Sequence, residues 1–221
     1  MPIYPLKIRI FAEISKYGME LIFATSNKGK LREAREILGG DYVLRSSADA
    51  GITEDIPETG NSFRENSLQK AEYIWKKCGC NCFSDDSGLE VDALGGAPGI
   101  YSARYAGEGH DFDRNISKLL HELSLLDAKA LIEGKPAPER TARFRCVVTL
   151  MLDGEPHFFE GSIEGRIAYS RSGNGGFGYD PVFIPDAFPD RSLAEVPEDV
   201  KNSISHRGEA LRKMAEWLKL R

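Results

Sequence analysis

Two neighbouring carboxylates, Asp85 and Asp86, are the clearest chemical signal in this chain of 221 residues. They follow the apolar segment 80–84 and precede Ser87 and Gly88. Adjacent carboxylates repel each other, so keeping both ionised requires a cation or full hydration. The same residues also fit an ordinary surface turn. Taken alone, the pair therefore indicates either a metal site or a turn.

Lysines follow the first strongly apolar segment of the chain. Residues 21–25 predict a buried strand and residues 26–30 a tight turn, after which Leu31, Ala34 and Leu38 recur at helical spacing. The free N–H groups of a helix N-terminus, its dipole and a lysine charge together favour an anion. The P-loop pattern is absent, which argues against a standard ATPase. A plain strand–turn–helix scaffold remains the alternative.

Two glutamates precede the next predicted helix, which spans residues 62–77. Residues 62–65 have the form of a capping box, which gives Glu65 a structural role. No such role is evident for Glu58, which lies in the loop before that helix. Glu58 is therefore either a ligand or a solvated loop acid.

The C-terminal third holds groups suited to binding a planar or charged ligand. Between residues 173 and 178 there are four glycines, which allow close backbone approach, and Phe177, which can stack on a base. His206 and Arg207 open the last helix, where basic side chains oppose the dipole, so an anionic or carbonyl-bearing partner explains them. A flexible linker and a solvated basic pair are the alternatives. Arg104 either meets a phosphate or caps a loop.

The remaining pattern supplies the elements that position these groups. A strand over residues 80–84 is expected to deliver the two aspartates to its C-terminal end, where α/β sheets usually bind ligands. We predict a helix over residues 114–126, a mobile connection over 127–140, and two strands, 143–152 and 157–168, joined by a turn at 153–154.

Composition limits the possible partners. The net charge of −5 argues against a nucleic-acid polymer. No apolar run is long enough to span a bilayer, so no membrane partner is expected. Residues 1–18 are predicted to be a dispensable extension, and residues 19–221 a single two-lobed domain. Cys78, Cys80 and Cys82 lack common zinc-site spacing and indicate reduced thiols in the cytoplasm.

Together these segments resemble the inosine triphosphate pyrophosphatase family. The matching segments follow the family's order and extend from Leu21 nearly to the C-terminus: residues 24–30, 58–60, 65–66, 85–89, 95–104, 175–180, Lys201 and 205–208. Any one of these segments is weakly specific, whereas the whole series is highly specific. Ser26 stands where a small residue is usual, and Pro57 stands where many members have a second acid.

The resemblance implies an α/β fold, an elongated mixed β-sheet flanked by helices, in two lobes with the nucleotide cleft between them. It also implies a homodimer that hydrolyses ITP, dITP and XTP to the monophosphate and pyrophosphate. Asp86 is then the base with Asp85 supporting it, and Mg²⁺, or Mn²⁺, is held by Glu58 and Asp86. The implied substrate-binding residues are Thr25, Ser26, Asn27, Lys28, Gly29, Lys30, Ser87, Phe177, Gly178, Tyr179, Asp180, Lys201, His206 and Arg207.

Two other functions remain open at this point. Maf-type pyrophosphatases, which act on pyrimidine or modified nucleotides, share the general architecture but lack segments like 175–180 and 205–208. A non-catalytic nucleotide-binding module would not need the pair of aspartates and would show no metal-dependent turnover.

Overall fold

The structure, a computed structural model, describes residues 18–109 and 111–221, which group into two compact units. Unit 1 contains residues 18–85, Val147–Phe159 and Ala210–Arg221, and unit 2 contains Asp86–Cys146 and Glu160–Glu209. Apart from Gly18, the predicted extension lies outside the described residues.

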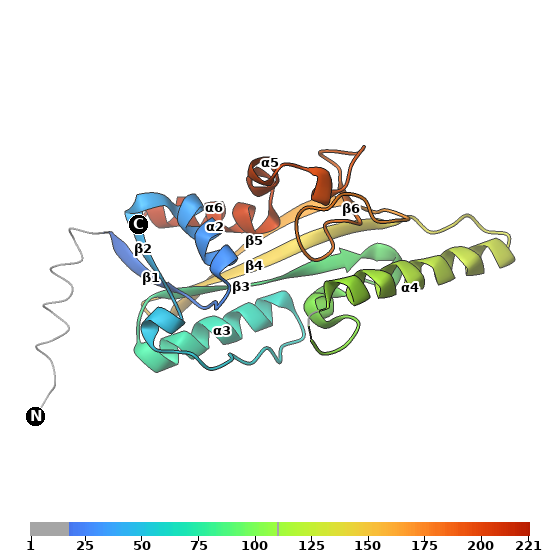
Figure 1. The fold of residues 1–221 in the computed structure, drawn as a ribbon. Helices are drawn as coiled ribbons and strands as arrows, with labels where there is room; N and C mark the ends of the chain where they lie inside the picture. The colour runs from blue at the N-terminus through green and yellow to red at the C-terminus, as the bar shows by residue number, and fades with distance from the viewer. Residues whose placement is uncertain (1–17, 110) are drawn as a thin grey trace, which may run out of the picture. The chain divides into compact units, whose positions relative to one another are not determined.

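Six strands form one mixed sheet (Figure 1), which confirms the predicted α/β class. The strands are β1 (Met19–Phe23), β2 (Tyr42–Ser46), β3 (Cys82–Val91), β4 (Thr141–Leu152), β5 (Glu155–Ile167) and β6 (Phe183–Pro185). Their order in the sheet is β2-β1-β3-β4-β5-β6. Strand β1 is parallel to β2 and β3, whereas β5 is antiparallel to β6. Asp153 and Gly154, both with positive φ, form the two-residue turn between β4 and β5.

The helices are α2 (Lys28–Leu38), α3 (Phe63–Cys78), α4 (Phe112–Ile132), α5 (Glu198–Ser203) and α6 (His206–Lys219). Short 3₁₀ helices occupy Gly39–Asp41, Ala48–Ala50, Asp92–Leu94, Gly99–Arg104 and Leu193–Glu195. Within the described part of the chain, none of the helices has the length and apolar character needed to cross a membrane.

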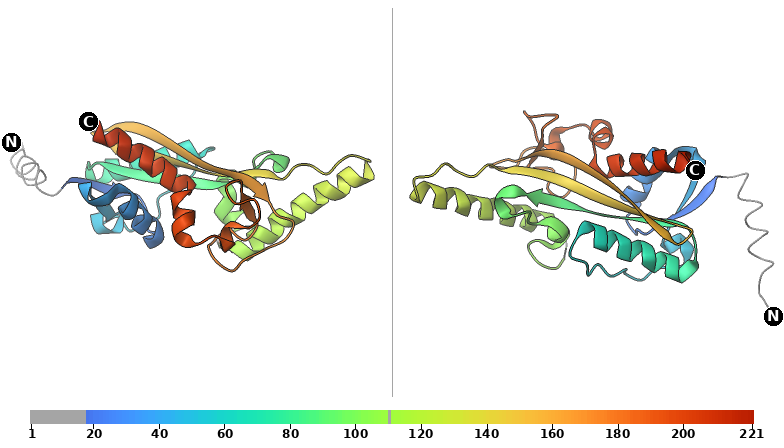
Figure 2. Two further views of the ribbon diagram at one scale, coloured as in Figure 1. Left: turned by 90° about the horizontal axis from the view of Figure 1, so that it is seen from above. Right: turned by 180° about the vertical axis from the view of Figure 1, so that it is seen from behind.

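In unit 1, helices cover both faces of the sheet. On one face Ala71 and Ile74 of α3 pack against Ile22, Cys82 and Met151. Neighbouring strand residues point to opposite faces, so Phe23 and Phe83 stack on the other side, with ring centroids 4.4 Å apart. Figures 1 and 2 show α2 and residues 210–219 of α6 on that second face. Each fully buried side chain of this size contributes about 1.5–3 kcal/mol.

In unit 2, α4 supplies most of the helical side of the core. Its residues Ile116, Leu119 and Leu123 belong to one buried cluster with Leu89 of β3 and Ile167 of β5. The helix is longer than the predicted range 114–126, because residues 127–132 contain no Gly or Pro and continue it. The predicted connection is therefore shorter and begins at residue 133, just before Gly134 with φ 66°.

The strand that carries the aspartates also differs from expectation. It was predicted to end at residue 84, but β3 continues to Val91, so Asp85 and Asp86 lie inside it. The neighbouring strand β1 pairs with β3 only as far as Phe23 opposite Phe83. Because β3 also has β4 as a neighbour, it continues past the end of β1. The aspartates therefore lie inside β3, just past the point where the neighbouring strand β1 ends, and not at the carboxyl end of β3 itself.

The four cysteines are free thiols, with Cys78 and Cys80 exposed and Cys82 and Cys146 buried. Burial is the main reason that the pKa of Cys80 is raised to about 11 and that of Cys82 to about 12. We expect a thiol reagent such as DTNB to modify the two exposed cysteines of the native protein, and Cys80 slowly, because the thiolate is the reactive form. All four should react after denaturation. A third reactive thiol in the native protein, or fewer than four in the denatured one, would contradict this arrangement.

Candidate active site

The turn before α2 is closed by its own side chains. Asn27 caps the helix, and its Oδ1 accepts hydrogen bonds from the N–H groups of Gly29 and Lys30 at 2.8 and 3.2 Å. The N–H of Asn27 in turn donates to Thr25 Oγ1 at 3.1 Å. Two of the amides expected to bind phosphate are thus already occupied, and they become available only if Asn27 moves. Ser26 and Lys28 are exposed.

Lys30, in the first turn of α2, holds one of the two aspartates. Its Nζ lies 3.1 and 2.9 Å from the two carboxylate oxygens of Asp85. Asp85 is 2% exposed, so water cannot replace this cation as a source of compensating charge. The carboxylate of Asp85 is therefore held by an ion pair within unit 1.

Ser62 begins α3 as predicted, because its side chain accepts a hydrogen bond from the N–H of Glu65 at 3.1 Å. The second bond of the predicted capping box goes elsewhere. Glu65 Oε2 accepts from the N–H of Asn61 at 2.7 Å, one residue before the expected partner. Glu65 thus fastens the loop before the helix, which is a structural role.

Glu58 lies in that loop and forms an ion pair with Lys70 of α3. The loop is tight, because the Gly60 N–H donates to the buried Asn66 side chain at 2.8 Å and a Cβ at Gly60 would lie 2.6 Å from Glu65 Cβ. Lys70 was not among the residues predicted from the sequence. Its position on the buried face of an amphipathic helix could have identified it, because a charged residue there requires a partner.

Asp86 begins the residues of unit 2 and is 8% exposed. Its Oδ1 accepts a hydrogen bond from the N–H of Ser87 at 3.0 Å. The hydroxyl of Ser87 lies 3.4 Å from Nη2 of Arg207, which is itself buried at the start of α6. His206 stacks on Phe144, with ring centroids 5.2 Å apart. The structure thus brings together Ser87 and Arg207, two of the predicted substrate-binding residues.

The glycine-rich loop forms a second cluster in unit 2. Asp180 Oδ2 accepts hydrogen bonds from the N–H of Phe177 and from Nζ of Lys201, both at 3.0 Å. The same ammonium lies 5.5 Å from the centroid of the Phe177 ring. That ring is 64% exposed and thus accessible for stacking. Gly176, with φ 74°, cannot be replaced without displacing Asp180, because an added Cβ would collide with its carboxylate.

Tyr179 lies in the same loop, but its side chain points into the core. It is 3% exposed, and its hydroxyl donates to the carbonyl oxygen of Ser102 at 2.9 Å. Burial raises the pKa of this hydroxyl, so it keeps its proton and remains a donor. A substrate contact at Tyr179 is therefore limited to its backbone.

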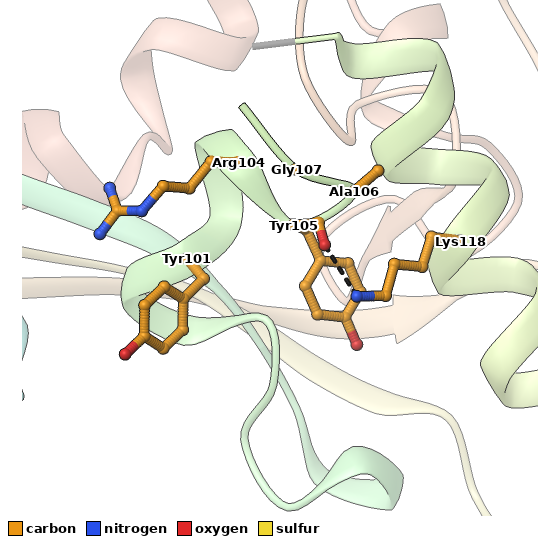
Figure 3. Close-up of a pocket in the computed structure, with 6 residues that line it drawn as sticks. All are labelled: Tyr101, Arg104, Tyr105, Ala106, Gly107 and Lys118. Atoms are coloured by element: carbon orange, nitrogen blue, oxygen red, sulfur yellow. Dashed lines mark hydrogen bonds between the residues drawn. The ribbon is translucent and has the colours of Figure 1, made fainter. Parts of the chain in front are cut away.

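An open pocket of about 580 Å³ lies elsewhere in unit 2, lined by Tyr101, Arg104, Tyr105, Ala106, Gly107 and Lys118. Figure 3 shows Tyr101 and Arg104 on one side and Tyr105 and Lys118 on the other. Lys118 Nζ donates to the Tyr105 carbonyl at 2.8 Å, and the Arg104 guanidinium lies 5.2 Å from the Tyr101 ring centroid. Sequence reasoning did not anticipate this pocket.

Among residues 18–109 and 111–221, no group of three or more His, Cys, Asp or Glu side chains is placed to hold an ion. This agrees with the usual coordination of Mg²⁺, which is bound by one or two carboxylates together with substrate phosphates and water. Glu58 and Asp86 each carry oxygen donors of the kind that Mg²⁺ prefers, and their role as metal ligands stays a prediction.

Comparison with known proteins adds independent information. The model of the Ham1 family matches residues 21–217. A dITP/XTP pyrophosphatase of Porphyromonas gingivalis is 49% identical over 199 residues, which cover 90% of this chain and 97% of that protein. Another dITP/XTP pyrophosphatase, from Flavobacterium johnsoniae, is 44% identical over 200 residues, with coverage of 90% and 98%. A solved HAM1 protein of Coxiella burnetii superimposes with a TM-score of 0.83 at 36% identity, covering 92% and 100%.

The pairing of Lys30 with Asp85 leads to a stability prediction. We expect Lys30→Met to lower the free energy of unfolding by about 3 kcal/mol, because it removes the cation beside a buried carboxylate. Urea denaturation measures the change. Lys28→Met, in the same turn but exposed, is the matched control and should change stability by less than about 0.5 kcal/mol. Equal effects of the two substitutions would show that the ion pair is not stabilising. Replacing Asp85 by Asn in the Lys30→Met background should recover part of the loss.

Proposed function

The chain belongs to the Ham1 family, and from that premise we propose that it hydrolyses non-canonical purine nucleoside triphosphates such as ITP, dITP and XTP. The products are the nucleoside monophosphate and pyrophosphate. The family membership agrees with the resemblance found in the sequence motifs.

The pairing of acids with lysines carries the proposal. Three acids of the predicted site are each held by a lysine of the same unit. The pairs are Asp85 with Lys30, Glu58 with Lys70 and Asp180 with Lys201. A triphosphate bound to a divalent cation can join such pairs, because its phosphate oxygens suit the ammonium groups and its cation suits the Glu58 carboxylate. Charges that are already paired then stay compensated when the substrate binds, which limits the cost of desolvating them.

The proposed cation is Mg²⁺, with Glu58 and Asp86 as its protein ligands. When bound, Mg²⁺ neutralises charge on the leaving pyrophosphate and helps to orient the attacking water. Lys70 is part of this arrangement, since it forms an ion pair with the Glu58 carboxylate.

Asp86 is the proposed general base. Its carboxylate takes the proton from the water that attacks the α-phosphorus, while its hydrogen bond from the Ser87 N–H fixes its orientation. Asp85 supports it from the preceding position of β3. Because Lys30 holds Asp85 within unit 1, Asp85 helps to position its neighbour and does not itself transfer a proton.

Substrate recognition is divided between the phosphates and the base. We assign the phosphates to residues 25–30 and Ser87, with Lys28 and Lys30 supplying charge. Phe177 stacks on the base, and Lys201, His206 and Arg207 donate to phosphates or to the purine 6-oxo group. Donors directed at an oxo group leave the 6-amino group of adenine unpaired, and unpaired buried groups discriminate strongly.

The proposed enzyme acts as a homodimer in the cytoplasm. Four free thiols support a reducing compartment. The homodimer rests on the family resemblance.

One assay tests the function directly. Pyrophosphate release is measured from dITP, XTP, dTTP and GTP, with and without Mg²⁺. We expect rapid, Mg²⁺-dependent release from dITP and XTP. Preferential turnover of dTTP would support a Maf-type activity instead, and absence of turnover with all four would support a non-catalytic module.

Replacing the base should abolish the reaction. Asp86→Asn keeps the size and most hydrogen-bonding capacity of the side chain but removes its ability to accept a proton. We expect turnover to fall by at least about 100-fold, in line with general-base catalysis, while the thermal unfolding midpoint changes little. Near-normal turnover by this variant would rule out Asp86 as the base.

Removing the exposed ring should weaken binding rather than chemistry. We expect Phe177→Ala to raise KM for dITP by the equivalent of about 1–3 kcal/mol, the usual contribution of base stacking, with a smaller change in kcat. Tyr101→Ala, which removes another exposed ring of unit 2, is the matched control and should leave KM unchanged. The same KM for wild type and Phe177→Ala would exclude stacking at this position.

A further inference from the structure

The 3₁₀ helix Gly99–Arg104 has an outer and an inner side. Tyr101 and Arg104 lie on the outer side and line the pocket of Figure 3. Ser102 lies on the inner side and is 9% exposed. Its hydroxyl donates to the carbonyl of Gly99 at 2.6 Å and accepts from the N–H of Leu89 at 2.8 Å. Leu89 lies on β3, three residues after Asp86, so Ser102 is anchored to the strand that carries the proposed base.

The carbonyl of Ser102 connects this strand with the glycine-rich loop. It accepts the hydrogen bond from the Tyr179 hydroxyl at 2.9 Å and a longer one from Asn115 Nδ2 at 3.4 Å. Asn115 is 1% exposed and also bonds Ala103 and Ala106. The acceptor is therefore held in place from several directions, and Tyr179 meets a fixed partner.

Polar side chains anchor the loop at both ends, where Ser172 bonds Glu195 and Asp180 pairs with Lys201, whereas Tyr179 is its anchor in the core. Gly176 and Gly178 have φ of 74° and 62°, conformations that glycine adopts without strain. Phe177 projects outward, whereas Tyr179 belongs to the buried core cluster of unit 2. The buried Tyr179 ring attaches the loop to the core, and the hydrogen bond from the Tyr179 hydroxyl to Ser102 fixes how deeply the ring lies in the core. Tyr179 lies between Phe177 and Asp180 in the chain, and the Phe177 N–H donates to the Asp180 carboxylate, so the three residues are linked.

We propose that the Tyr179–Ser102 hydrogen bond makes Tyr179 a positioning residue, which holds Phe177 and Asp180 in register for the purine base. The inference rests on the proposed function, in which Phe177 stacks on the base. Tyr179 acts through its neighbours and not by touching the reacting atoms. Loss of the hydroxyl should therefore weaken recognition of the base and leave the phosphate chemistry unchanged.

The test compares two tyrosine hydroxyls of unit 2. Tyr179→Phe removes the hydroxyl that bonds Ser102, and Tyr105→Phe removes one that bonds Glu122 beside the pocket. For each variant, kcat and KM are measured with dITP and with ribose 5-triphosphate, a substrate without a base. Thermal unfolding midpoints show whether the variants are folded, and calorimetry gives the Kd of dIMP without requiring turnover.

We expect Tyr179→Phe to raise KM for dITP and Kd for dIMP about three- to tenfold, the effect of losing one buried hydrogen bond. Its kcat, and both constants with ribose 5-triphosphate, should stay within about twofold of wild type, since only recognition of the base is affected. Tyr105→Phe should match wild type throughout.

Unchanged dITP and dIMP constants in Tyr179→Phe would overturn the inference. Equal losses with dITP and with ribose 5-triphosphate would also overturn it, because they would indicate general loosening of the fold. Failure of the proposed function has a different signature, namely no pyrophosphate release from dITP by the wild-type enzyme. In that event the inference is overturned as well, unless the wild-type protein binds dIMP and the Tyr179→Phe variant binds it more weakly.

Discussion

Two consecutive carboxylates inside a buried strand are the constraint on which the rest of this site depends. Asp85 is 2% and Asp86 8% exposed, so hydration cannot relieve their repulsion. Successive strand residues point to opposite faces, so the two side chains need separate partners. Asp85 has the Lys30 ammonium, and Asp86 accepts the N–H of Ser87. Their different surroundings explain how identical residues can have different roles.

The lysines show how such a site remains stable before its ligand arrives. Lys70 is 7% exposed, so its ammonium would be costly to bury without the Glu58 carboxylate. Lys201 is less buried, with 16% of its side chain exposed, and Asp180 keeps it beside the Phe177 ring. Groups that are already desolvated and oriented lose little entropy when a phosphate replaces the carboxylate. In the proposed function, the same side chains therefore contribute to the stability of the protein and to its affinity for a polyanion.

The glycine-rich loop has a different requirement, because its backbone must adopt conformations that favour glycine while its side chains stay in fixed positions. Glycine at position 176 makes room for the Asp180 carboxylate, and the positive φ of Gly178 allows a sharp turn. Such freedom would leave Phe177 poorly placed without an anchor. Tyr179 supplies that anchor by burying its ring and bonding a carbonyl near β3. One loop thus exposes one aromatic ring for a ligand and buries another for support.

The sequence by itself determined the residue types of the site, their order along the chain and most helices and strands, because spacing, caps and turns are local properties. It identified Ser62 as a cap and α6 as beginning at His206. Only the tertiary structure decided that β3 continues past the aspartates, since its neighbours in the sheet set its length. The same is true of Lys70 beside Glu58, 12 residues away, and of Tyr179 beside Ser102, 77 residues away. These contacts join groups that only packing brings together, and no local pattern encodes a distance between them.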